Sequence, residues 1–145
     1  MLTCTRSISF DAAHRIMNHE SQCKMVHGHR YTIEATFQAK DLDMLGRVID
    51  FGVIKTVLGQ WILDNWDHTM ILWEEDKALG TLITESIGQK IYYLPTNPTA
   101  ENMAYYLLHS VCPSLFGEAE AHCVKIRLYE TPNCYAECAL WLPSS

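Results

Sequence analysis

Residues 30–40 read Arg-Tyr-Thr-Ile-Glu-Ala-Thr-Phe-Gln-Ala-Lys, a run in which apolar and polar side chains alternate. Successive side chains of an extended chain point to opposite faces, so this pattern predicts a β-strand with one buried and one solvated face. Residues 6–14 alternate in the same way. We therefore expect two neighbouring strands that pair antiparallel near the start of the chain.

The middle of the chain changes to helical periodicity. Apolar residues recur at helical spacing from about residue 51 to residue 65, which predicts an amphipathic helix there. A second helix is predicted after Pro98, with Thr99 as its N-cap and its end before Pro113. Residues 70–94 contain short apolar runs whose type the pattern leaves open.

Alternation returns in residues 124–129 and 136–141, on either side of a Thr-Pro-Asn-Cys turn at 131–134, and predicts a C-terminal hairpin. The order of two strands, two helices and two strands predicts an α+β fold, a four-stranded antiparallel sheet with two helices on one face. A chain of 145 residues suits a single domain spanning residues 1–145. The exposed edges of such a sheet favour self-association.

Composition narrows the class of partner. The chain has 11 Lys and Arg against 17 Asp and Glu, a net charge of -6, which argues against binding of nucleic acid. Residues 1–10 lack the apolar core of a secretory signal, and no apolar run reaches the length needed to cross a bilayer. We expect a cytoplasmic protein that does not bind membranes.

Residues 23–29 read Cys-Lys-Met-Val-His-Gly-His. In an extended segment His27 and His29 share one face, and antiparallel pairing with the preceding strand brings His14 to the same place. Three neutral imidazoles with one vacant position are the usual ligands of a catalytic zinc. The alternative is a closed structural site in which Cys23 is the fourth ligand.

Two further features suggest proton transfer and ligand recognition. In Asp67-His68 the carboxylate can orient the imidazole, and with Cys23 the pair would form a thiol, imidazole and carboxylate set. The alternative is a surface pair. Glu130, at the end of a predicted strand, can accept two hydrogen bonds from the amidine-like edge of a pterin or guanine, or can be an exposed hairpin residue.

These residues fall into six blocks that span nearly the whole chain and resemble, in order, those of the 6-pyruvoyl-tetrahydropterin synthase superfamily. The blocks are Phe10-Asp11-Ala12-Ala13-His14, Cys23-x3-His27-Gly28-His29, Asp50-Phe51, Trp66-Asp67-His68, Pro98-Thr99-Ala100-Glu101-Asn102 and Tyr129-Glu130-Thr131. The three-residue spacer between Cys23 and His27 resembles the bacterial 6-carboxy-5,6,7,8-tetrahydropterin synthases of the queuosine pathway.

The resemblance implies a tunnelling fold, in which ββααββ subunits form trimers around a joined barrel and two trimers stack into a homohexamer with active sites between subunits. It also implies a pterin substrate, 7,8-dihydroneopterin triphosphate, and the products 6-carboxy-5,6,7,8-tetrahydropterin, acetaldehyde and triphosphate. The nearest alternative is the sister reaction, which yields 6-pyruvoyl-tetrahydropterin without carbon–carbon cleavage. A third possibility is a non-catalytic zinc module that serves assembly.

The resemblance implies a role for each site residue by its position in the blocks. The Zn²⁺ ligands are His14, His27 and His29. The proton acceptor and its relay are Cys23, His68 and Asp67. Glu130 contacts the pterin and is commonly treated as part of the relay as well. Thr99 and Glu101 contact the pterin from a neighbouring subunit. By themselves, these two residues indicate only the start of a helix.

Overall fold

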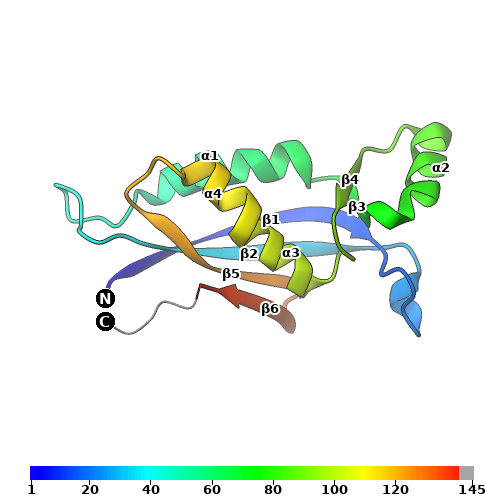
Figure 1. Ribbon diagram of the computed structural model, residues 1–145, viewed down its shortest axis with the longest axis horizontal. Coiled ribbons are helices and arrows are strands. Elements are labelled where there is room, and N and C mark those ends of the chain that lie inside the picture. The colour runs from blue at the N-terminus through cyan, green and yellow to red at the C-terminus, as the bar shows by residue number, and fades with distance from the viewer. Residues whose placement is uncertain (141–145) are drawn as a thin grey trace.

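A computed structural model describes residues 1–140, which form one twisted six-stranded sheet with helices over one of its faces (Figure 1). The strands are β1 (Thr3–His14), β2 (His27–Gln38), β3 (Thr69–Trp73), β4 (Ile91–Leu94), β5 (His122–Thr131) and β6 (Cys134–Ala139). The helices are α1 (Phe51–Asn65), α2 (Lys77–Ile87), α3 (Ala100–Tyr106) and α4 (Cys112–Phe116), with 3₁₀ turns at Gln22–Lys24 and Glu74–Asp76. The predicted α+β class is confirmed.

The prediction of a four-stranded antiparallel sheet is wrong, because the strand order is β4-β3-β1-β2-β5-β6 and the sheet is mixed. The four predicted strands form its antiparallel part, whereas β3 runs parallel to β1 and β4 runs parallel to β3. Four of the five residues of β3 are buried, so it has no alternation to reveal it, and β4 has four residues. Residue 141 of the predicted hairpin lies outside the described residues.

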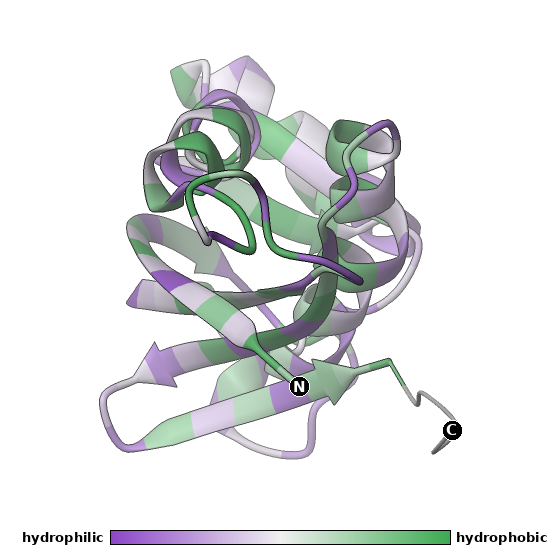
Figure 2. Ribbon diagram, turned by 90° about the vertical axis from the view of Figure 1, so that its left-hand side faces the viewer, coloured by the Kyte–Doolittle hydropathy of each residue, from purple (hydrophilic) through white to green (hydrophobic). Residues whose placement is uncertain are grey.

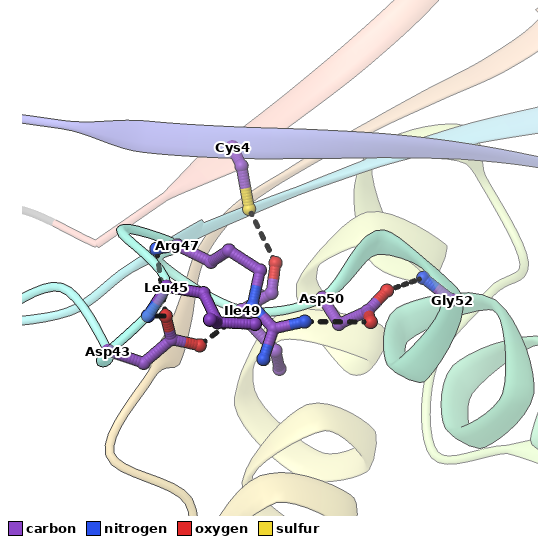
Figure 3. Close-up of polar contacts among 7 residues, drawn as sticks. All are labelled: Cys4, Asp43, Leu45, Arg47, Ile49, Asp50 and Gly52. Carbon is purple, nitrogen blue, oxygen red and sulfur yellow. Dashed lines mark hydrogen bonds and ion pairs between the residues drawn. The ribbon is translucent and has the colours of Figure 1, made fainter.

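Helix α1 begins and ends where the periodicity predicted, and a small polar network stabilises its start (Figure 3). The Asp50 carboxylate accepts a hydrogen bond from the backbone N–H of Gly52 at 2.7 Å, which caps the helix. The Arg47 guanidinium contacts Asp50 at 3.1 Å and Asp43 at 2.8 Å. The loop before α1 therefore supplies the N-cap of the helix, and ion pairs of Arg47 fix the position of this cap.

The second predicted helix does not end before Pro113. It continues as α3, a π-helical turn over Leu107–Val111, and α4, which reaches Phe116. Proline is excluded from a helix interior because its ring clashes with the preceding turn and it lacks an N–H. Here Pro113 lies in the first turn of α4, directly after the π-turn in which the N–H of Cys112 bonds to the carbonyl of Leu107. The wider turn relieves that conflict.

The core lies between the sheet and the helices. Tyr31, Ile33, Ala35 and Phe37 of β2 are all fully buried, as the alternation predicted, and they belong to one apolar cluster with residues of α1 and α3. Figure 2 shows the matching bands of apolar and polar residues along the strands. Among residues 1–140, no helix is long and apolar enough to cross a bilayer.

Besides the edge strand β4, two further edges of the sheet are open within the described residues. Strand β3 pairs with β1 over Ala12–His14 alone, so within the described part of the chain residues 3–10 have no strand partner on that side. On the other side of the sheet, β6 is an edge strand. Unpaired edges are where further strands add to a sheet.

Candidate active site

The pairing of β1 with β2 assembles the predicted histidine cluster. Its register sets His14 opposite His27 and Ala12 opposite His29. One nitrogen atom from each of the three rings lies within 4.8 Å of the other two. His14 is 1% exposed, so the cluster forms at the buried end of the strand pair.

Backbone carbonyls orient two of these rings. Nδ1 of His14 lies 2.8 Å from the carbonyl oxygen of Pro98, and Nδ1 of His27 lies 2.7 Å from that of Met25. A carbonyl oxygen only accepts, so each Nδ1 donates and each neutral ring presents a lone pair on Nε2. The two Nε2 atoms are 3.2 Å apart. Such carbonyl-bound imidazoles are typical of metal ligands.

The third imidazole has an unsatisfied nitrogen. Nε2 of His29 is buried and has no hydrogen-bond partner among residues 1–140. A buried polar atom without a partner is costly, and a cation between three converging lone pairs would satisfy it together with the other two. The donor set therefore fits a divalent ion such as zinc. Cys23 is not a member of this cluster, which argues against the closed structural site.

Burial keeps two of the three imidazoles, His14 and His29, in the neutral form that binds metal. Burial lowers the pKa of His14 to about 4, the charges of His27 and His29 act in the same direction, and the hydrogen bond to Pro98 opposes them. Burial also lowers the pKa of His29, although the Glu130 carboxylate, 3.8 Å from its Nε2, acts to raise it. At neutral pH these rings are uncharged and can donate lone pairs.

A cavity of about 250 Å³ brings together Cys23, Thr99, Glu101 and Glu130. Glu130 belongs to the cavity lining and also faces His29, so the cavity opens beside the histidine cluster. The Thr99 hydroxyl accepts a hydrogen bond from the N–H of Asn102 at 3.1 Å, so it caps α3 as predicted while lining the cavity.

The pair Asp67 and His68 lies away from this cavity, in the turn between α1 and β3. Nδ1 of His68 is 2.9 Å from Asp67 Oδ2. The main chain of Asp11 in β1 anchors both residues: its N–H donates to Asp67 Oδ1 at 3.0 Å, and its carbonyl accepts from the N–H of His68 at 2.6 Å. The His68 ring is 77% exposed, and its φ of 54° is in the left-handed region, which is uncommon for a side chain of this size.

The two members of this pair shift each other's pKa. Burial acts to raise the pKa of Asp67, but hydrogen bonds from Asp11 and His68 outweigh it and the pKa is lowered. The hydrogen bond to Asp67 raises the pKa of His68. Both shifts favour an ion pair that can hold a proton. The depressions that these residues line contain Asp11 and Arg30 and not Cys23, so one chain does not place the thiol and the relay in one cavity.

Three side chains with polar atoms that line the Cys23 cavity were not predicted from the sequence: His19, Cys134 and Tyr135. They come from the loop after β1 and from the start of β6, and they meet through the fold rather than through any spacing. The position of Cys134 just after the turn that follows Glu130 was the one available signal. Asp11 was missed as an anchor because it acts through its main chain, which no residue type reveals.

A family model described as 6-pyruvoyl tetrahydropterin synthase matches residues 3–140. The chain is 48% identical over 137 residues to the 6-carboxy-5,6,7,8-tetrahydropterin synthase of Rickettsia bellii (strain RML369-C), covering 94% of this chain and 99% of that protein. Among solved structures, the 6-pyruvoyl tetrahydropterin synthase of Caenorhabditis elegans superposes with a TM-score of 0.70 at 22% identity, covering 97% and 96% of the two chains. The crystal structure of an uncharacterized protein from Wolinella succinogenes superposes with a TM-score of 0.76 at 18% identity, covering 95% of this chain and 97% of that chain. These two structures share the fold.

Proposed function

The chain belongs to the 6-pyruvoyl tetrahydropterin synthase family, and we propose that it is a zinc-dependent 6-carboxy-5,6,7,8-tetrahydropterin synthase. Its substrate is then 7,8-dihydroneopterin triphosphate, and its products are the 6-carboxy pterin, acetaldehyde and triphosphate. Identity near one half over the full length of relatives of that name supports this activity. The observation that carries the proposal is the three-histidine cluster, from which Cys23 is excluded, beside a cavity lined by Cys23 and Glu130.

His14, His27 and His29 would hold the zinc ion through Nε2. Zinc bound there supplies Lewis acidity toward the side-chain oxygens of the pterin. The chain's own contribution is to keep the rings of His14 and His29 neutral by burial and to fix the rings of His14 and His27 on the carbonyls of Pro98 and Met25.

The cavity residues supply binding and proton transfer. The Cys23 thiolate accepts a proton from the substrate side chain, because a thiolate is a base of suitable strength near neutral pH. The Glu130 carboxylate accepts two hydrogen bonds from the amidine-like edge of the pterin ring. Thr99 and Glu101, at the start of α3, are further contacts for the ring. They line the cavity of the same chain as Cys23, whereas the resemblance implied contacts from a neighbouring subunit.

We place the His68 and Asp67 relay of each site on a neighbouring copy of the chain. The strands β1, β2, β5 and β6 alternate in direction, so β6 of one copy continues the alternation if it meets residues 3–10 of β1 of the next copy antiparallel. Repetition of this contact closes a barrel, and two stacked rings of three would form the homohexamer. The antiparallel contact brings the start of β6, with Cys134 of the cavity, toward the end of β1, where Asp11 anchors the relay.

Product analysis tests the proposed function. Zinc-loaded protein is incubated with 7,8-dihydroneopterin triphosphate, and the products are identified by mass spectrometry. We expect the 6-carboxy pterin with acetaldehyde. A 6-pyruvoyl product would instead assign the sister reaction.

The variant Cys23→Ala separates the enzyme from a structural zinc module. Because Cys23 is outside the histidine cluster, we expect the variant to keep its zinc and its melting temperature and to lose about 10³-fold in turnover. Loss of zinc and stability in this variant, with no turnover by the native protein, would contradict the proposed function in favour of the module.

A further inference from the structure

We propose that Asn97 is a positioning residue that ties the loop carrying Cys23 to the start of α3, where Thr99 lines the cavity and the carbonyl of Pro98 orients His14. This inference rests on the proposed function in taking Cys23 and His14 as active-site groups. Asn97 lies in the loop between β4 and α3, and it lines none of the cavities described above.

The Asn97 side chain makes two hydrogen bonds to the main chain of one residue, Met17. Its Oδ1 accepts from the N–H of Met17 at 3.0 Å, and its Nδ2 donates to the carbonyl of Met17 at 2.9 Å. The two partners are 80 residues apart in the sequence. One amide therefore satisfies both polar groups of a peptide segment, as a neighbouring strand would do.

The segment that contains Met17 is also hydrogen-bonded to Cys23. The N–H of Ile16 donates to the carbonyl of Cys23 at 2.7 Å. Residues 15–17 therefore lie between Cys23 and Asn97 and transmit the position of one to the other.

On the other side, the main chain of Asn97 organises the start of α3. Its carbonyl accepts from the N–H of Thr99 and from Nδ2 of Asn102, both at 2.9 Å. The next carbonyl, that of Pro98, is the acceptor that orients the imidazole of His14. Hydrogen-bond partners of metal ligands tune metal affinity, so a shift of this loop reaches the histidine cluster.

The isosteric variant Asn97→Asp tests this role. It keeps the acceptor for the N–H of Met17, removes the donor, and sets a second carboxylate oxygen against the carbonyl of Met17. We expect zinc affinity to fall about tenfold in competition with a chromophoric chelator, and the visible spectrum of bound Co²⁺ to change. We also expect iodoacetamide to modify Cys23 of the metal-free protein about fivefold faster, because the loop is released. Peptide mass spectrometry separates Cys23 from the other thiols.

Thr84→Val is the matched control, because it also removes one side-chain hydrogen bond to a backbone carbonyl, from Thr84 Oγ1 to Gln89 at 3.0 Å, in α2 and away from the cavity. It should leave zinc affinity, the Co²⁺ spectrum and the alkylation rate of Cys23 as in the native protein. If Asn97→Asp fails to fold, Asn97→Ala, which deletes both bonds without adding a repulsion, is measured instead.

A folded Asn97 variant with native zinc affinity and native alkylation of Cys23 would overturn the proposal. None of these measurements needs the pterin. An absence of turnover in the native protein would therefore count against the proposed function and leave the positioning role to be judged on its own.

Discussion

The histidine cluster and the Asp67–His68 pair differ in how much of their surroundings one chain supplies. His14 is 1% exposed and its pKa is lowered to about 4, whereas the ring of His68 is 77% exposed and its pKa is raised. The cluster has its orienting carbonyls and its neighbouring cavity within the same chain. The pair has an anchor in Asp11 but no thiol in its own depressions. In the proposed function, metal binding then belongs to the single chain and turnover to the assembly.

Mixing two inactive variants tests whether one active site takes residues from two chains. If Cys23 and His68 of one site come from different copies, hexamers assembled from equal amounts of Cys23→Ala and His68→Ala contain some sites with neither lesion. We expect activity to rise from background to about a quarter of the native value, as random mixing at a two-chain site predicts. The measurement is turnover after joint refolding, with mixed assemblies verified by native mass spectrometry.

The matched control for that mixture combines Cys23→Ala with Glu130→Ala. Both residues line the cavity of one chain, so every site in this mixture retains a lesion and activity should stay at background. Verified mixed hexamers of the first pair without recovered activity would show that thiol and relay come from the same chain.

A smaller effect is expected from Asp67→Asn. The asparagine keeps an acceptor for the N–H of Asp11 but removes the carboxylate whose hydrogen bond and charge raise the pKa of His68. We expect kcat to fall about 10²-fold with zinc affinity unchanged, because neither Asp67 nor His68 belongs to the histidine cluster. Steady-state kinetics and chelator competition measure the two quantities. Asp64→Asn, which neutralises another carboxylate near the end of α1, should keep the native kcat, and a loss there equal to that in Asp67→Asn would point to a change in the helix.

Much of the fold follows from local rules. The alternation of β1 and β2 needs no distant information, and α1 begins at residue 51 because Asp50 caps it. β3 was missed because a strand buried on both faces has no period. Helix α2 was left unassigned although Leu79, Ile83 and Ile87 recur at helical spacing over its eleven residues, so this helix could have been predicted. The helix end at Pro113 was predicted wrongly because a π-turn, which accommodates the ring, has no sequence pattern.

The contacts of the candidate site likewise include some that the sequence predicts and some that it does not. The convergence of His14, His27 and His29 could be predicted because one strand pairing fixes all three. The two hydrogen bonds between Asn97 and Met17 could not be predicted, because the two residues are 80 positions apart and each residue type is ordinary in a loop. Spacing reveals contacts made within one strand pair, whereas contacts between loops depend on the completed fold.

The smallest predicted effect is that the pKa values of His14 and His68 depart from their ordinary value in opposite directions. In metal-free protein, NMR should give His14 a pKa of about 4 and His68 a pKa above its ordinary value. Between about pH 4 and the ordinary pKa of His14, the unfolded chain binds more protons than the folded chain does. Protonation of His14 therefore lowers the free energy of unfolding as pH falls through that window. For His68 the sign is reversed: its contribution is complete below the ordinary pKa and is lost as pH rises through the raised one, and it is small because the ring is exposed. Asp67→Asn should return the pKa of His68 toward its ordinary value and leave that of His14 in place. Movement of both together would show that the two regions are coupled within one chain, against the separation on which the shared site depends.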